Sequence, residues 1–140
     1  MMGDGRDVFP HRITAPDGKS KITVHRFYSA QREMPLGQGL QARVHFYSNL
    51  HIKDLLSRVI NNQDPEEGIT YEVPDDVSEE FLKQLDSERR IKKNGKPIWV
   101  QIGKRDNHFW DCECIGVAAL VMLKLLGKDS FEEEIDKRKE

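Results

Sequence analysis

The longest apolar segment, FWDCECIGVAALVMLKLL (Phe109 to Leu126), constrains the fold more than any other part of the sequence. Lys124 is its only charged residue after Glu113. A helix that is apolar nearly all round is buried within a protein or a membrane, and this segment interrupts its apolar run with charge. We therefore expect a helix buried at the centre of the domain and ended by Gly127.

Size and charge limit what surrounds this helix. A chain of 140 residues fits one small domain. Its 22 basic and 24 acidic residues give a formal charge of −2, so any nucleic-acid site must be a local patch. No segment resembles a membrane span or a secretory signal, which indicates a soluble, intracellular protein. Cys112 and Cys114 are two positions apart on the expected helix, so they face different sides and suit neither a disulfide nor a zinc knuckle.

Hydrophobic periodicity predicts an α/β fold. A capping box of Asp76 and Glu79 opens one helix, with Phe81, Leu82 and Leu85 as its buried stripe. Pro16-Asp17-Gly18 predicts a turn, and Asn94-Gly95 predicts a tight turn. The expected strands are 8–13, 21–28, 42–47, 69–73 and 97–102; the expected helices are 51–60, 77–89 and 109–126; and residues 34–39 break the chain. We divide the chain into a loosely held segment 1–41, a domain 42–127 and a charged tail helix 128–140.

Polar and ionisable side chains gather in Lys104 to Asp111, at the start of the apolar helix. In one interpretation Asp106 or Asn107 caps the helix and Asp111 complements its dipole, an effect of about 0.3–1 kcal/mol. Spacing alone favours this interpretation. In the other, Asp111 binds a metal, because carboxylate oxygens are the ligands of Mg²⁺ and Mn²⁺. Phosphodiester cleavage by paired metals needs several carboxylates, and one aspartate is not such a cluster.

Other candidate residues carry weaker signals. His108 and Cys112 have the spacing of half a zinc site, but no second pair has ligand-like spacing, which favours packing or surface roles. Lys53-Asp54 is either a phosphate contact or a solvated pair, and we favour the solvated pair. A basic tip around the Asn94 turn suits contact with a nucleic-acid backbone, although a soluble hairpin has the same composition; it consists of Lys92, Lys93 and Lys96.

Three segments, in order, resemble the nuclease domain of the GpA-type terminase large subunit of tailed phages. They are HFYSNLHIKDLLSRV (45–59), ITYEVPDDVSEEFLKQLDSERRI (69–91) and RDNHFWDCECIGVAALVML (105–123). The second resembles a strand, a proline and an acidic turn followed by EE-[FY]-xx-QL-xx-E. The third is the most specific and resembles R-N-E-x-x-D-C-x-x-Y-A-L-A-A-L. The resemblance covers residues 42–126, with His108 where the family usually has Glu and Ile115 where an aromatic residue is common.

This resemblance implies a partial RNase H-like (RuvC-like) fold, in which a mixed sheet packed by helices gathers three acidic residues around two divalent metals, Mg²⁺ or Mn²⁺. Asp111 matches the third of these residues and is the implied catalytic metal ligand. The first two have no counterpart in this sequence. Under this resemblance we expect Lys53, Lys104 and Arg105 to contact or orient DNA phosphates, and Asn107 and His108 to support the site.

The resemblance also implies double-stranded phage DNA as substrate, the terminase small subunit and the portal as partners, and action in the host cytoplasm. With two of three ligands missing, we expect a weak metal site and little nuclease activity for these 140 residues, and a homodimer formed over uncovered surfaces. The enzyme interpretation predicts Asp111 at an open sheet edge. The alternative, a small α/β binding or assembly module without catalysis, predicts that backbone amides engage Asp111 away from any acidic neighbour.

Overall fold

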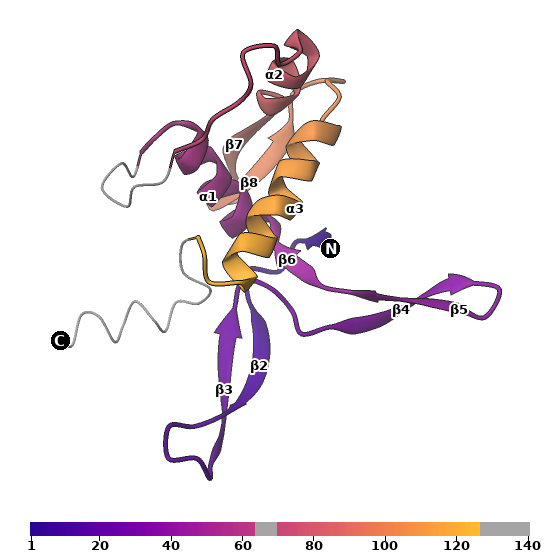
Figure 1. The fold of residues 1–140 in the computed structure, drawn as a ribbon, viewed down its shortest axis with the longest axis vertical. Helices are drawn as coiled ribbons and strands as arrows, with labels where there is room; N and C mark the ends of the chain where they lie inside the picture. The colour runs from indigo at the N-terminus through magenta and orange to yellow at the C-terminus, as the bar shows by residue number, and fades with distance from the viewer. Residues whose placement is uncertain (64–69, 127–140) are drawn as a thin grey trace. The chain divides into compact units, whose positions relative to one another are not determined.

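The computed structural model describes residues 1–63 and 70–126, and Figure 1 shows its helices and strands. By contacts the chain divides into two compact units, Met1–Asn49 with the chain from Ala118 onward, and Leu50–Val117. The elements of the chain, in order, are β1 (Met2–Asp4), β2 (Phe9–Thr14), β3 (Lys21–Arg26), β4 (Arg32–Gly37), β5 (Leu40–Val44), β6 (Phe46–Ser48), α1 (Asn49–Ile60), α2 (Glu79–Leu85), β7 (Glu88–Lys93), β8 (Lys96–Gln101) and α3 (His108–Met122).

The strands pair two by two. In the described ranges β1 pairs with β6 in parallel, and β2–β3, β4–β5 and β7–β8 are antiparallel hairpins. The α/β prediction is therefore confirmed, whereas the expected single mixed sheet is not what these strands form. The strand expected over 42–47 is two strands, β5 and β6, and Thr70 to Val73, expected as a strand, is irregular; Ile69 lies outside the described residues.

Two hairpins occupy the first unit. The strands expected over 8–13 and 21–28 are confirmed as β2 and β3, joined by a turn in which Asp17 accepts hydrogen bonds from the amides of Lys19 and Ser20. Residues 34–39, expected only to break the chain, form most of β4 and its turn. The turn of β4–β5 has positive φ at Gly37, Gln38 and Gly39, so the glycines that suggested a break allow a hairpin instead.

In the second unit α2 is shorter than predicted. Ser78 is its N-cap and accepts a hydrogen bond from the Phe81 amide at 3.1 Å, so the capping box of Asp76 is wrong. The helix ends at Leu85 instead of position 89. Leu82, assigned to the buried stripe, is 49% exposed, and the buried side chain of α2 is Gln84.

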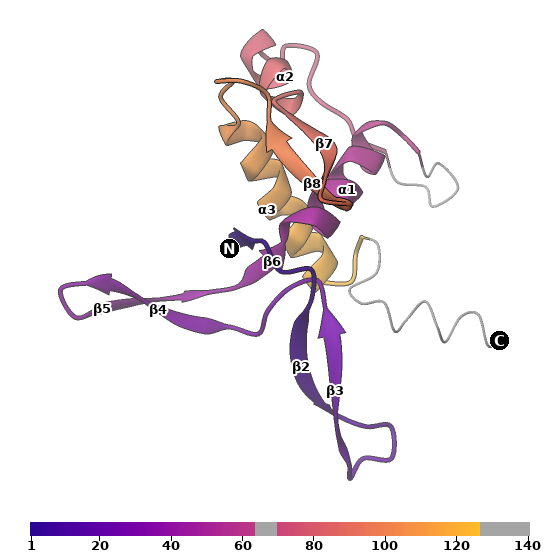
Figure 2. The ribbon, with the colours of Figure 1, turned by 180° about the vertical axis from the view of Figure 1, so that it is seen from behind.

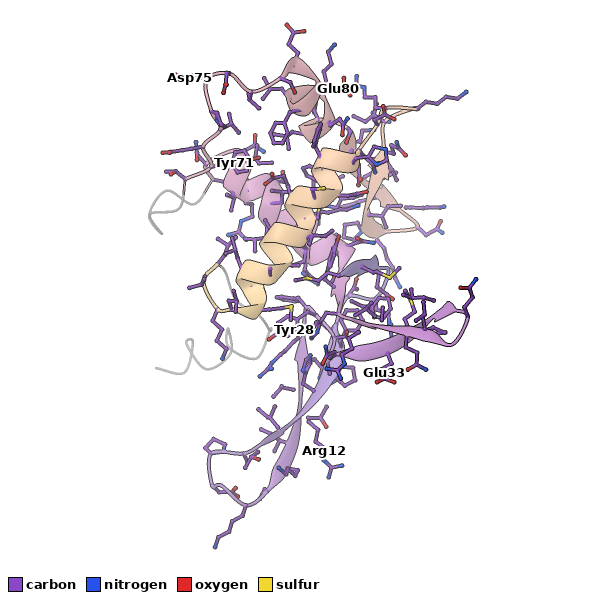
Figure 3. The ribbon with its side chains drawn as sticks, turned by 45° about the vertical axis from the view of Figure 1, so that its right-hand side comes forward. Arg12, Tyr28, Glu33, Tyr71, Asp75 and Glu80 are labelled. Atoms are coloured by element: carbon purple, nitrogen blue, oxygen red, sulfur yellow. The ribbon has the colours of Figure 1, made fainter. Side chains whose placement is uncertain are left out.

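The hairpin β7–β8 follows α2 after two residues. Asn94 and Gly95 have φ values of 52° and 77°, which confirms the predicted tight turn. The hairpin lies against α1 in both views of the chain (Figures 1 and 2), and Asp54 of α1 accepts hydrogen bonds from Arg90 of β7 and Trp99 of β8. The end of the expected helix 77–89 is therefore occupied by the first residues of a strand, and Glu88 begins that strand.

The apolar segment forms α3, but it is not buried all round. Trp110, Cys114 and Val121 are buried, whereas Ile115 and Leu120 are 39% and 40% exposed, so the expectation of an enclosed helix is wrong. The helix ends at Met122, and the hydrogen bonds from Leu125 to the Leu120 carbonyl and from Lys124, at positive φ, to the Val121 carbonyl form a Schellman motif. Gly127 and the expected tail helix lie outside the described residues.

None of the helices within residues 1–63 and 70–126 is long and apolar enough to cross a membrane.

Candidate functional site

A buried ion pair lies at the point where α1 and β7 meet. The Oε1 atom of Glu88 is 2.6 Å from Nζ of Lys53, and the two side chains are 4% and 12% exposed. The other carboxylate oxygen, Oε2, accepts a hydrogen bond of 3.0 Å from Nδ2 of Asn107, in the loop before α3. A buried carboxylate stays charged only where charged and hydrogen-bonding partners replace water, and these two side chains do so. Glu88 is thus held by two different segments.

Asp111, in the first turn of α3, is the second carboxylate of this site. Burial raises the pKa of Asp111, and the negative charge of Glu88 raises it further, while Lys53 and His108 act in the opposite direction. No described residue donates a hydrogen bond to the Asp111 carboxylate. The geometry expected of a pure binding module, with Asp111 held by backbone amides away from other acids, is therefore not found. The acidic neighbour is Glu88.

The start of α3 is capped from outside its own segment. The amide of Phe109 donates to Oε1 of Gln84 at 2.8 Å, and the Gln84 amide donates to Glu80 at 2.8 Å within α2. The Asn107 carbonyl accepts the first helical hydrogen bond from Asp111, but its side chain turns to Glu88. The prediction that an Asp106 or Asn107 side chain caps α3 is therefore wrong, and the Asn107 amide is available to the site because Gln84 replaces it.

Asp54, next to Lys53 on α1, fixes the hairpin that carries Glu88. Its carboxylate accepts hydrogen bonds from Nε of Arg90 at 3.0 Å and from Nε1 of Trp99 at 2.7 Å. The expected solvated pair of Lys53 and Asp54 is therefore wrong, because both side chains contact β7–β8. Partly exposed pairs such as Asp54 with Arg90 contribute little to stability. Their consequence is positional, since they set where β7 begins.

The residues predicted to contact DNA fall into two groups. The Lys53 ammonium group is engaged by Glu88, so it is part of the buried site. Arg105 is exposed and donates to the Asp86 carbonyl at 3.0 Å, and Lys104 is exposed beside it. These two line an open cleft of about 560 Å³ along α2, which acidic side chains also line, among them Glu80, Asp86 and Asp106. The cleft thus has mixed charge. His108 is also exposed, and it lowers the pKa of Asp111.

The chemistry of the Glu88 and Asp111 carboxylates suits one hard cation. Mg²⁺ is commonly bound through one or two carboxylates, with water and substrate phosphates as its other ligands. Glu88 and Asp111 provide two such groups, and a cation beside Asp111 favours the charged form that burial disfavours. In the described part of the chain no three or more His, Cys, Asp or Glu side chains cluster as metal ligands. Cys112 is exposed and Cys114 buried, as their spacing predicted, which does not suit zinc.

Glu88 is the site residue that the sequence analysis missed. It is the last residue of the segment matching EE-[FY]-xx-QL-xx-E, which was available as a signal. The helix expected over 77–89 placed it instead at a solvated helix end. Of the predicted site residues, Lys53 and Asn107 contact Glu88, and Asp111 is influenced electrostatically by Glu88, Lys53 and His108. Lys104 and Arg105 lie in the cleft along α2.

Comparison with known families gave one match. The family model described as terminase large subunit gpA, endonuclease domain, matches residues 6–131. The matched range contains Lys53, Glu88 and Asp111, and it extends beyond the 42–126 covered by the resemblance to include the β2–β3 and β4–β5 hairpins. Neither the curated proteins nor the solved structures gave a match.

Proposed function

Because the chain belongs to the endonuclease-domain family of the terminase large subunit gpA, we propose that Glu88 and Asp111 bind a divalent cation, Mg²⁺ or Mn²⁺, for hydrolysis of phosphodiester bonds in double-stranded DNA. The observation that carries this proposal is that two carboxylates from different elements influence each other electrostatically beside a buried lysine. Removing such carboxylates from water is costly unless positive charge compensates them. Lys53 forms an ion pair with Glu88, whereas none of the described side chains forms an ion pair or a hydrogen bond with the half-buried Asp111 carboxylate.

Each residue then has a distinct task. Asp111 offers its carboxylate to the cation, and Glu88, held by Lys53 and Asn107, supplies the second negative charge at a fixed position. When bound, the cation supplies Lewis acidity toward a phosphoryl oxygen of DNA. His108 is exposed near Asp111, and its proposed task is to support the site. Lys104 and Arg105 are proposed to contact DNA phosphates from the cleft along α2.

The finer expectations of the resemblance belong to the same proposal. We attribute to the domain an RNase H-like fold in which α3 presents Asp111 as the third acidic residue. Paired-metal cleavage needs more carboxylates than Glu88 and Asp111. We therefore expect these 140 residues to bind one cation weakly and to cleave DNA slowly or not at all. In the packaging machine the proposed partners are double-stranded DNA, the terminase small subunit and the portal.

The test is a titration of the ¹⁵N-labelled chain with Mn²⁺, followed by NMR. Paramagnetic Mn²⁺ should broaden the amides near Glu88 and Asp111 selectively, and Mg²⁺ should restore them by competition. Asp111→Asn should abolish the broadening. The matched control is Asp76→Asn, which makes the same substitution at an exposed acid before α2. No selective broadening in the wild type, or broadening that survives Asp111→Asn, would refute the metal site.

A further inference from the structure

Positive charge is concentrated on the β7–β8 hairpin, although the whole chain has a formal charge of −2. The hairpin contains five cationic residues and one acidic residue, Glu88. Glu88 is neutralised by Lys53, and Arg90 is held by Asp54. The remaining four cations are exposed, and none of the described residues forms an ion pair with them; they are Arg89, Lys92, Lys93 and Lys96. Arg89 adjoins Glu88 at the base of the hairpin, and the three lysines around the turn, Lys92, Lys93 and Lys96, are called the cationic tip below.

The pairing of the two strands shows that the cationic tip does not stabilise the hairpin that carries it. Lys93 and Lys96 are direct cross-strand partners at the Asn94-Gly95 turn. Like charges placed opposite each other destabilise an antiparallel pair. Lys92, adjacent along the strand, adds to the same local field, and no described carboxylate offsets it. An anion that contacts both strands near the turn removes this repulsion.

The place of the cationic tip relative to the site indicates which anion fits. β7 begins with Glu88 in the site and runs to Lys93 at the turn, five residues later. At about 3.4 Å per residue this separation is about 17 Å. B-form DNA rises about 3.4 Å per nucleotide along each strand, so 17 Å corresponds to about five nucleotides. A single rigid hairpin thus connects the two carboxylates to a group of lysines at a spacing that a DNA backbone can follow.

We propose that the β7–β8 hairpin is a DNA-binding arm, whose cationic tip binds the phosphate backbone of duplex DNA about five nucleotides from the bond held at Glu88 and Asp111. The position of that bond rests on the function proposed above, whereas the binding of duplex DNA by the tip does not. The arm reads no sequence, because lysines that contact phosphates contribute affinity without base recognition. Asp54 and Trp99 hold its base against α1, so the tip stays at a fixed distance from the site.

The test measures how binding of a labelled 30-base-pair duplex depends on salt, by fluorescence anisotropy in EDTA, where no cation occupies the carboxylates. Each phosphate contact contributes about 0.9 to the slope of log K against log salt. Reversing Lys92, Lys93 and Lys96 to Glu should therefore lower the magnitude of the slope by about 2.7. The triple change to Gln should lower it as well, and far-UV circular dichroism checks that both variants fold.

The control is a second triple reversal with the same change in net charge, placed outside both the hairpin and the cleft along α2: Arg12→Glu, Lys19→Glu and Arg43→Glu, all at exposed positions. This variant should keep most of the slope. Equal losses in both triple variants, or no loss in the Lys92, Lys93 and Lys96 variants, would overturn the arm. If the Mn²⁺ titration shows no selective broadening but the Lys92, Lys93 and Lys96 variants lose slope as expected, the metal site is refuted and the DNA-binding arm is supported.

Discussion

Lys53→Met tests the arrangement of the site most directly, because it removes one charge from a buried pair and keeps the aliphatic stem. In the folded chain Glu88 is 4% exposed and Lys53 is 12% exposed, with 2.6 Å between the charged atoms. The variant leaves Glu88 charged, buried and near Asp111, with Asn107 as its remaining partner. Removing one partner of a buried pair costs about 3–5 kcal/mol. At about 4 °C per kcal/mol for a chain of this size, Tm should fall by about 12–20 °C.

A double-mutant cycle separates the charge effect from lost packing. Glu88→Gln alone should also destabilise the chain, because it leaves the Lys53 ammonium group without its carboxylate. The double variant, Lys53→Met with Glu88→Gln, contains neither charge and should recover at least half of the loss seen in Lys53→Met. Thermal and urea unfolding at pH 7, followed by far-UV circular dichroism, give the four stabilities. Additive losses, or a Tm for Lys53→Met within about 2 °C of the wild type, would refute a buried, coupled pair.

Two further predictions follow from the ionisable groups near α3. Because the pKa of Asp111 is raised on folding, its stabilising contribution is full at pH below the unfolded pKa and is lost as the pH rises through the folded pKa. Asp111→Asn should therefore raise the urea midpoint of unfolding at pH 7 in EDTA, and the increase should become smaller as the pH approaches 4. An unchanged midpoint at pH 7 would contradict this. Burial raises the pKa of Cys114 to about 12, whereas Cys112 is exposed. Dithionitrobenzoate should therefore label Cys112 in the native chain and Cys114 only after unfolding. Two rapidly labelled thiols per native chain would contradict this prediction.

Turns were the part of the fold most readily predicted from sequence. Asn94-Gly95 has positive φ at both positions, and Pro16-Asp17-Gly18 forms the β2–β3 turn with Gly18 at φ 74°. These signals depend on the backbone preferences of one or two residues, so distant parts of the chain do not change them. The positions of both turns could therefore be predicted, whereas β7, the strand before the Asn94-Gly95 turn, was not expected.

The end of α2 could not be predicted in this way. Glu88, Arg89 and Arg90 are good helix formers, and their position after Leu85 fits a continuing helix. In the structure these residues pair with Gln101, Val100 and Trp99 of β8. That pairing is set by residues about ten positions further along the chain, and it outweighs local propensity. The same effect concealed Glu88, because its role depends on β7 beginning at that residue.

Apolar composition likewise predicted α3 but not its surroundings. A helix that is apolar on all sides is enclosed only if other elements cover every side, and composition does not count those elements. Exposed Phe109, Ile115 and Leu120 show that α3 is covered on part of its circumference in the described chain. The early polar residues of the helix left two interpretations of Asp111 open, a helix-end residue and a metal ligand, and the metal role stays a prediction.

The two carboxylates differ in how far the adjacent sequence determines their surroundings. Glu88 is compensated within the chain by Lys53 and Asn107, and this requires three segments to come together. Asp111 forms no ion pair or hydrogen bond of this kind with a described side chain, and its place in the first turn of α3 follows from the adjacent sequence. The proposed cation would therefore have the larger electrostatic gain at Asp111, because binding at Glu88 competes with an existing ion pair. Lys53 thus does for Glu88 what the proposed cation does for Asp111, and the site holds two acids together by compensating each one differently.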